Sequence, residues 1–257
     1  MSKWRPSKYK NIYVIPDVHG RINELKLILN RILPLRKDDE IVFLGDYIDR
    51  DKNSHLVVDL CIDLQKHYLN QVVCIQGNHE SMLLDAISPS NNSNKYLFWM
   101  KNGGEHSLVG YLERSGIYVD SPYSVDRNRI KDFIPENHKQ WFRNLPVFYE
   151  TDKYKFVHGG CDPLLDLDKQ DPNVLIWDRS IYNFVKKIQN YYGNTESFSW
   201  NKTIVTGHNG EKDSPLITDK FMMLDCSVRK FLLVYELNSR TGFEARYGKE
   251  RLVKFNE

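Results

Sequence analysis

Three short apolar runs between residues 12 and 75 constrain the fold more than any other feature of the chain. Ile12–Ile15, Ile41–Leu44 and Val72–Ile75 are rich in β-branched residues and have the length of buried parallel strands. The two segments between them carry apolar residues at helical spacing: Ile22, Leu25, Leu29 and Ile32 in the first, and Val57, Leu60, Cys61 and Leu64 in the second. The order β-α-β-α-β, with right-handed crossovers, predicts three parallel strands in one sheet.

The rest of the chain divides into a helical part and a strand-rich part. Ser88–Lys95 has the composition of a loop, and helical patterns follow at Tyr96–Lys101 and Glu105–Arg114, so we expect a helical cap over roughly residues 81–145. Strand-like runs then dominate, at Val147–Tyr149, Lys155–Val157, Thr203–Val205, Phe221–Leu224 and Phe231–Tyr235. We expect an α/β fold in which these runs form a second sheet packed on the first, a two-sheet α/β sandwich with a helical cap insertion. Nothing resembles a linker, so residues 1–257 are expected to form a single domain.

Composition excludes several classes of protein. The chain has 27% charged and 41% apolar residues and a formal net charge of +2, which indicates a globular protein without affinity for nucleic acid or membranes. The basic start of the chain (Lys3, Arg5, Lys8, Lys10) is expected to be a solvated tail. The sequence contains no bilayer-spanning apolar run and no secretory signal, and its four cysteines are scattered, so we expect a cytoplasmic protein with reduced thiols.

Polar residues follow each of the first three strands, where open α/β sheets place their ligands. The segments are Asp17-Val18-His19-Gly20, Gly45-Asp46-Tyr47-Ile48-Asp49-Arg50 and Gly77-Asn78-His79-Glu80. Because the carboxyl ends of parallel strands meet at one edge of a sheet, we expect these segments to converge on one site. The residues expected there are Asp17, His19, Asp46, Asp49, Arg50, Asn78 and His79.

Later strand ends add two imidazoles, His158 in Val157-His158-Gly159-Gly160 and His208 in Gly207-His208-Asn209. Carboxylate, imidazole and amide donors together suit a borderline divalent transition metal, and one Asp can bridge two ions. Asp-x-His-Gly or Gly-His alone is a weak signal. Gly-Asn-His-Glu has a chance expectation of about one in a thousand at average composition, and all the motifs in order, each after a predicted strand, exclude coincidence.

Several other polar or aromatic residues favour structural interpretations. Glu80 opens a predicted helix, where a carboxylate suits the helix dipole. Asp225 fits an ordinary turn as well as a place beside the metal ligands. The remaining histidines lie outside any ligand-like context, and three tryptophans are expected to pack in the core or cap: these are His55, His67, His106 and His138, and Trp99, Trp141 and Trp200.

In this order, the motifs Asp-x-His-Gly, Gly-Asp-x-x-Asp-Arg, Gly-Asn-His-Glu, His-Gly and Gly-His resemble those of the calcineurin-like metallophosphoesterase superfamily. The resemblance is closest to its phosphoprotein phosphatase branch, in the short bacterial and bacteriophage lambda form, and covers roughly Ile12–Tyr235. It implies a dinuclear metal-dependent phosphoesterase that hydrolyses phosphate monoesters with a metal-bound hydroxide, as a serine/threonine protein phosphatase does. It also implies two divalent ions, Mn²⁺ in the first place and iron or zinc as alternatives.

The resemblance assigns roles residue by residue. It implies that Asp17 and His19 bind the first metal and that Asp46 bridges both ions. The second metal would be bound by Asn78, His158 and His208. His79 would be the general acid, oriented by Asp49. The substrate phosphate would be held by Arg50, Asn78 and Arg179, the last in Leu175-Ile176-Trp177-Asp178-Arg179.

The chain departs from the family pattern at three positions, and the change at Pro16 is expected to leave metal binding intact. Pro16 replaces a Gly before Asp17, Asp51 replaces a Gly after Arg50, and Gln76 stands where serine/threonine phosphatases carry Arg. Because this Arg is absent, a second enzyme class remains an alternative. It is a nucleotide hydrolase like the symmetrical diadenosine tetraphosphatases, which also lack this Arg. The expected partner is therefore a phosphorylated protein or a nucleotide. An inactive scaffold is a third alternative, which the intact metal and acid positions disfavour.

Overall fold

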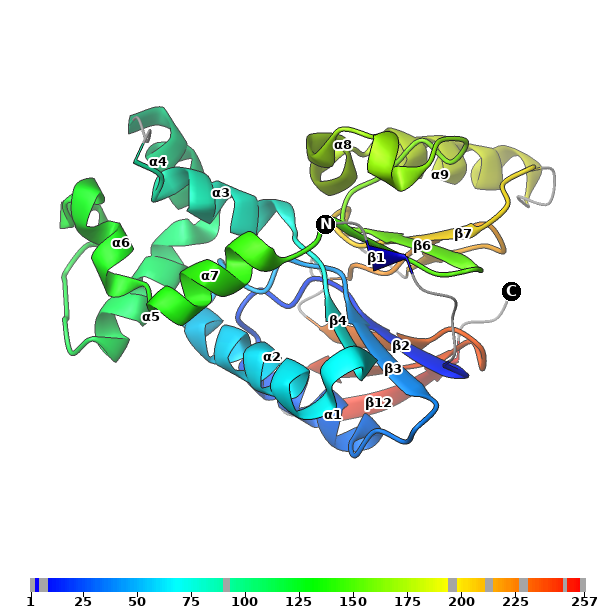
Figure 1. Cartoon of the computed structure of the whole chain (residues 1–257), viewed down its shortest axis with the longest axis horizontal. Helices are drawn as coiled ribbons and strands as arrows, with labels where there is room; N and C mark the ends of the chain where they lie inside the picture. Colours follow the sequence, from blue (N-terminus) through cyan, green and yellow to red (C-terminus); the bar gives the residue numbers. More distant parts are fainter. Residues whose placement is uncertain are drawn as a thin grey trace.

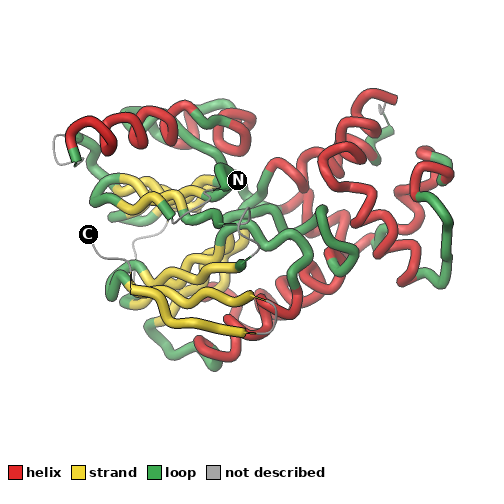
Figure 2. Tube along the Cα trace, turned by 180° about the vertical axis from the view of Figure 1, so that it is seen from behind, coloured by secondary structure: helices red, strands yellow, loops and turns green. Residues whose placement is uncertain are grey.

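Two six-stranded β-sheets packed face to face form the centre of the fold (Figure 1). The computed structural model describes residues 3–4, 9–89, 93–193, 198–210, 215–226, 231–246 and 249–254, and the numbers of strands refer to these residues. Helices cover the outer face of each sheet, so that the layers run α-β-β-α (Figure 2). This arrangement confirms the predicted two-sheet α/β sandwich.

The first sheet contains the three predicted parallel strands. Strands β2 (Asn11–Ile15), β3 (Asp39–Phe43) and β4 (Val72–Cys74) lie side by side and parallel. They are connected by helices α1 (Ile22–Ile32) and α2 (Ser54–Tyr68), which pack their apolar faces on the sheet. Three antiparallel strands extend the sheet beyond β2: β10 (Leu232–Glu236), β11 (Thr241–Arg246) and β12 (Lys249–Lys254).

The second sheet has the order β1-β5-β6-β7-β9-β8. Its strands are β1 (Lys3–Trp4), β5 (Phe148–Glu150), β6 (Tyr154–Val157), β7 (Thr203–Thr206), β8 (Leu216–Ile217) and β9 (Phe221–Met223). The central strands β6, β7 and β9 are parallel, so their carboxyl ends also meet at one edge. The outer face is covered by α8 (Pro172–Trp177) and α9 (Ser180–Tyr192).

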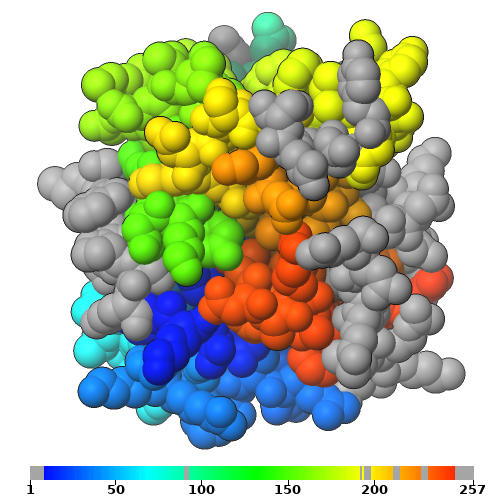
Figure 3. Space-filling model, turned by 90° about the vertical axis from the view of Figure 1, so that its right-hand side faces the viewer, coloured from blue at the N-terminus to red at the C-terminus, as the bar shows by residue number. Residues whose placement is uncertain are grey.

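The sequence-based assignment was wrong at both ends of the chain. The run Phe231–Tyr235 was expected in the second sheet, but β10 pairs antiparallel with β2 in the first sheet, with Tyr235 opposite Val14. Viewed from the end away from the cap (Figure 3), the β10–β11 region lies beside the N-terminal residues of the first sheet, next to β2. The first two described residues of the expected tail, Lys3 and Trp4, pair with β5 as strand β1.

Apolar layers on both sides of each sheet hold the sandwich together. Along β3, Ile41 and Phe43 face α1 and α2, whereas Val42 and its successor Leu44 face the other sheet. This alternation follows from the two-residue period of a strand, and both sets are apolar because both faces of the sheet are covered. The strand ends that carry the polar motifs are thereby fixed against a buried core.

Helices between β4 and β5 form a cap beside the sandwich (Figure 1). They are α3 (Asn78–Ala86), α4 (Ser93–Trp99), α5 (Glu105–Arg114), α6 (Ile130–Phe133) and α7 (Glu136–Asn144). Buried His138 of α7 binds Asp59 of α2 at 2.9 Å and Tyr111 of α5 at 3.0 Å, which fastens the cap to the sandwich. Within the described ranges, no helix has the length and apolar character needed to cross a membrane.

Candidate metal centre

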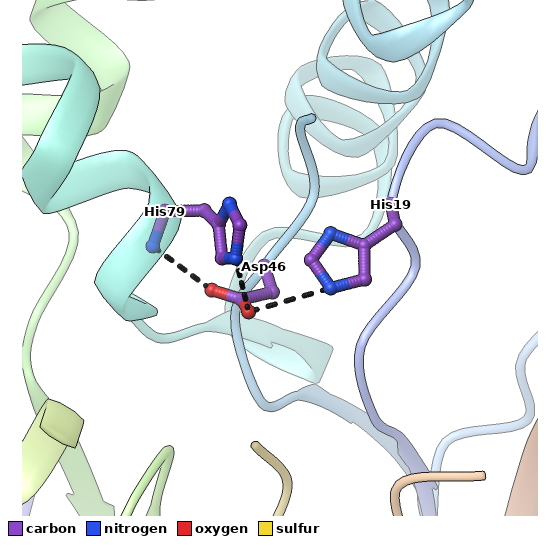
Figure 4. Close-up of side chains that lie close together, drawn as sticks. All are labelled: His19, Asp46 and His79. Carbon is purple, nitrogen blue, oxygen red and sulfur yellow. Dashed lines mark hydrogen bonds and ion pairs between the residues drawn. The ribbon is translucent and has the colours of Figure 1, made fainter. Parts of the chain in front are cut away.

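Buried side chains from three separate strand ends meet at the Asp46 carboxylate (Figure 4). Nε2 of His19 lies 3.5 Å from Asp46 Oδ2, and Nε2 of His79 lies 3.7 Å from the same oxygen. Asp17 Oδ2 lies 3.8 Å from His19 Nε2, so a second carboxylate faces the same imidazole. The ligand atoms of His19, Asp46 and His79 lie within 4.8 Å of one another, and with Asp17 beside them these groups suit a divalent cation.

A second group of donors lies on the other side of Asp46. His158 Nε2 is 3.3 Å from Asp46 Oδ1 and 2.9 Å from Asn78 Oδ1. A ligand atom of His208 lies within 4.8 Å of those of Asp46 and His158. Asp46 therefore belongs to two ligand groups at once, which is the position that a carboxylate bridging two ions would occupy.

The tautomers of two imidazoles fit a metal. Nδ1 of His19 donates to the carbonyl oxygen of Ile48, and Nδ1 of His158 donates to that of Leu44, both at 2.8 Å. Each Nε2 is thereby directed into the site, as in metal-ligating histidines held by a backbone carbonyl. His19 Nε2 is buried without a hydrogen-bond partner among the described residues. An unpaired buried nitrogen is costly unless a cation binds it, so the residues present fit the metal pair.

Charge in the site also favours cations. Burial would lower the pKa of His158, but the charges of Asp46 and Asp17 outweigh burial and raise it to about 10. The field there favours positive charge on Nε2. Burial and the neighbouring His79 hold the pKa of His19 well below its usual range, and burial and His158 lower that of His208 to about 3. Both rings are therefore neutral, the form in which an imidazole binds a metal.

Backbone conformation at the site is unusual. Of the seven non-glycine residues with positive φ among those described, five are candidate site residues: His19, Asp46, Asp49, Arg50 and His208. Such conformations cost of order 1–3 kcal/mol each and persist where function requires them. Glycine is required beside them, because a Cβ at Gly77 would overlap Asp46 Oδ1 and one at Gly207 would overlap Asp17 Oδ1. These clashes explain the Gly-Asn-His-Glu and Gly-His motifs.

Two charged residues that hold the ligand loops, one buried and one partly buried, were not recognised as site residues from the sequence. Glu80 accepts backbone N–H groups of Asp46, Tyr47, Ile48 and Gly77 at 2.9–3.4 Å. Arg21 donates to the carbonyl oxygens of Asp17, Val18 and Phe231 at 2.6–2.8 Å. The spacing Gly77-x-x-Glu80 indicates a capping interaction, but contacts with a loop more than thirty residues away carry no local signal. The structural interpretation of Glu80 is confirmed, with a role in shaping the metal loop.

His79 and Asp49 form a buried pair at the rim of the ligand set. Nδ1 of His79 lies 2.7 Å from Asp49 Oδ2, and its Nε2 lies 3.3 Å from Nη2 of Arg50. Burial would lower the pKa of His79, but Asp46 and Asp49 reverse this effect and raise it. An imidazole held by a carboxylate on one nitrogen, with the other nitrogen facing the ligand set, has the arrangement of a proton donor.

The remaining expected site residues lie around this centre. Arg179, which precedes α9, donates from Nε to Nε2 of His208 at 3.1 Å and therefore lies against one of the candidate metal ligands. Asp225 follows β9 and, after burial, is the strongest cause of the raised pKa of Asp17. The side chains of Gln76 and Asp51, two positions where the chain departs from the family pattern, bind other parts of the protein. Gln76 donates to the Phe142 carbonyl in α7 at 3.5 Å, and Asp51 accepts from the backbone N–H of Asn53 at 2.8 Å.

Known proteins are similar to this chain in sequence and in fold. The family described as Calcineurin-like phosphoesterase matches residues 10–221. A serine/threonine-protein phosphatase 2 from Salmonella typhimurium is 27% identical over 205 residues, which cover 78% of this chain and 80% of that protein.

Two solved structures share the fold. A candidate diadenosine tetraphosphatase superposes with a TM-score of 0.58 at 17% identity, covering 100% of this chain and 99% of the other. A serine/threonine phosphatase from Saccharomyces cerevisiae superposes with a TM-score of 0.57 at 16% identity. The superposition covers 100% of this chain and 84% of the yeast chain. The family match spans most of the chain, and the two ligand groups around Asp46 fit a metal-dependent site. The chain belongs to the calcineurin-like phosphoesterase family of metal-dependent hydrolases that act on phosphate esters.

Proposed function

We propose that this protein is a serine/threonine protein phosphatase that uses two divalent ions, Mn²⁺ in the first place. The observation that carries the proposal is the Asp46 carboxylate, 3.5 Å from His19 Nε2 on one side and 3.3 Å from His158 Nε2 on the other. Asp17, His19 and Asp46 would bind one ion, and Asp46, Asn78, His158 and His208 the other. When bound, such a pair lowers the pKa of water toward neutrality and clamps phosphate oxygens.

His79 is the group that can protonate the leaving oxygen. Its Nδ1 is held by Asp49, and its Nε2 faces the ligand set beside Arg50. The alkoxide that leaves from phosphoserine or phosphothreonine needs a proton, and a positioned acid typically contributes ~10²–10⁴-fold to the rate. Asp49 would keep the ring oriented and charged during this transfer.

Two guanidinium groups flank the ligand set and would hold the phosphate. Arg50 lies beside His79, and Arg179 lies beside His208, so they approach from different sheets. Each can offer a charge-assisted hydrogen bond to a phosphoryl oxygen. Asn78, at the N-terminus of α3, would add an amide close to the same oxygens.

An open groove beside Arg50 supports a peptide substrate. The groove has a volume of about 470 Å³, and it lies between the turn at residues 50–53 and cap helix α5. Its lining residues are Arg50, Asp51, Lys52, Asn53, Glu105, His106, Val109 and Pro122. A chain extending from a phosphorylated serine could lie in it. The Salmonella relative, described as a serine/threonine phosphatase, supports the same substrate class.

The proposal is tested by comparing kcat/KM with Mn²⁺ for phosphoserine, phosphothreonine and phosphotyrosine peptides, diadenosine tetraphosphate and a cyclic nucleotide. We expect the phosphoserine and phosphothreonine peptides to exceed the nucleotides at least tenfold. A preparation of Asp46→Asn purified in parallel measures contaminating phosphatase. Preferred turnover of the dinucleotide would contradict the proposal and favour a nucleotide hydrolase.

A further inference from the structure

We propose that the cap positions the general-acid pair through two side chains, Trp99 at the end of α4 and Ser107 in α5. The inference rests on the proposed role of His79 and extends it to residues that the sequence motifs do not contain. Trp99 is fully buried, and so is Ser107. The expectation that Trp99 serves packing alone leaves out its indole N–H.

The carboxylate of Asp49 is held on all sides by the cap and by His79. The indole N–H of Trp99 is directed between the two oxygens, 3.1 Å from each. Oδ2 is also bound to His79 Nδ1 at 2.7 Å, and Oδ1 accepts from Ser107 Oγ at 2.8 Å. Asp49 is completely buried, so these groups replace the water that would otherwise solvate its charge. Its position, and through it the direction of the His79 ring, depends on them.

The hydroxyl of Ser107 has its single proton available for Asp49. Its oxygen accepts the backbone N–H of Asp49 at 2.8 Å, and the neighbouring hydroxyl of Ser54 donates to the Asp51 carbonyl at 2.6 Å. The Ser107 proton has two acceptors in reach, Asp49 Oδ1 at 2.8 Å and Ser54 Oγ at 3.0 Å, and the carboxylate is both the nearer and the charged one. One serine of the cap thus binds both the main chain and the side chain of Asp49.

The cap also fixes the turn that carries Asp49. Asp49 and Arg50 have φ values of +71° and +66°, a conformation that needs support from its surroundings. The N–H of Arg50 donates to the carbonyl of Gly103 at 3.0 Å, within the π-turn Met100–Gly104 that joins α4 to α5. A Cβ at Gly103 would come within 2.9 Å of the Arg50 side chain, and one at Gly104 would collide with the Trp99 ring. The irregular segment therefore brings the cap against the catalytic turn.

The test uses the need of the leaving group for a proton. Trp99→Phe removes the indole N–H, and Ser107→Ala removes the hydroxyl. We expect each to lower kcat for a phosphoserine peptide roughly tenfold, a part of the ~10²–10⁴-fold that a general acid supplies. For p-nitrophenyl phosphate, whose leaving group needs no proton, we expect a loss below about twofold. Bound Mn²⁺ per chain, measured by atomic emission, should not change.

Trp141→Phe is the matched control, because it removes an indole N–H from cap helix α7. That group binds Gln65 Oε1 at 2.7 Å, and Gln65 belongs to α2 and not to the acid pair. We expect this variant to keep the wild-type ratio of the two substrates. If Trp99→Phe does not fold, Ser107→Ala, which removes a single oxygen, decides the question through the same ratio.

His79→Asn separates failure of the inference from failure of the proposed function. We expect His79→Asn to lose activity selectively on the phosphoserine peptide, and Trp99→Phe to add nothing further in that background, since coupled residues are not additive. If His79→Asn is selective but the cap variants lower both substrates equally or add to it, the cap inference is wrong and the acid assignment remains. If His79→Asn is not selective, the acid role of His79 and the inference fail together.

Discussion

The proposed metal ligands and the proposed acid pair are held by different parts of the fold. Asp17, His19 and Asp46 lie on short turns directly after parallel strands, and backbone carbonyls of such turns orient the imidazoles. Asp49, in contrast, is held by Trp99 and Ser107 of the cap, and His79 lies on α3, the first helix of the cap. Substitutions in the two groups of residues should therefore affect different measurable properties. Damage to the turns should remove metal, and damage to the cap contacts should remove leaving-group protonation.

The largest expected effect is that of Asp46→Asn, which alters the carboxylate common to both ligand groups. The amide is neutral and has one acceptor oxygen, so both ions would bind weakly. We expect at least about a thousandfold lower kcat for p-nitrophenyl phosphate and peptide alike. Isothermal titration with Mn²⁺ should show loss of binding. Wild-type binding of two ions by this variant would mean that Asp46 does not bridge them.

The next effect is that of His79→Asn on the acid pair. We expect kcat for a phosphoserine peptide to fall by ~10²–10⁴-fold and that for p-nitrophenyl phosphate by far less. Metal content should stay at the wild-type value, since Asp46, Asn78 and the other ligands are intact. A series of aryl phosphates with leaving groups of different pKa measures this directly. A dependence on leaving-group pKa no steeper than that of wild type would show that His79 donates no proton.

Glu80→Gln should separate folding of the turn from chemistry. The carboxylate accepts four backbone N–H groups, and a side-chain amide would set its own N–H against some of them. We expect the free energy of unfolding in chelator to fall by about 2–3 kcal/mol, measured by urea denaturation. The control is Glu113→Gln, which removes a largely exposed ion pair with Lys52 and should cost about 1 kcal/mol or less. Equal decreases in the free energy of unfolding would show that the Glu80 hydrogen bonds stabilise the fold no more than an exposed ion pair does.

The smallest effect is expected from Gln76→Arg, at the border between strand and cap. Because the Gln76 amide is directed to the Phe142 carbonyl, a guanidinium there is not aimed at the phosphate. We expect KM for a phosphoserine peptide to change less than about threefold, whereas a new bidentate phosphate contact would lower it roughly ten- to thirtyfold. Steady-state kinetics on the peptide and on diadenosine tetraphosphate distinguish the two results. A tenfold gain on the peptide would show that residue 76 reaches the substrate.

The sequence predicts those parts of the fold whose signals are local. The strands and helices from Ile12 to Ile75 and helix Glu105–Arg114 have regular apolar spacing, and the structure has them there. Phe231–Tyr235 is a strand as expected, but an apolar run does not indicate which sheet it joins. Its pairing with β2 is decided by tertiary packing across more than two hundred residues.

The same division holds at the site. Motifs at strand ends predicted that Asp17, His19, Asp46 and His79 would lie together, because parallel strands bring their carboxyl ends to one edge. Trp99 and Ser107 contact Asp49 from 50 and 58 positions away, and neither lies in a motif that indicates a polar role. Aromatic side chains in a helix favour a packing interpretation, and only the structure shows where the indole N–H is directed.

The most direct measurement is activity followed against bound metal. Protein dialysed against chelator is titrated with Mn²⁺ while hydrolysis of p-nitrophenyl phosphate and bound metal per chain are recorded together. The two ligand groups that share Asp46 predict that metal-free protein is inactive and that activity rises to its maximum only as the second ion binds. Full activity without metal, or a maximum reached with one ion per chain, would contradict a dinuclear phosphoesterase site.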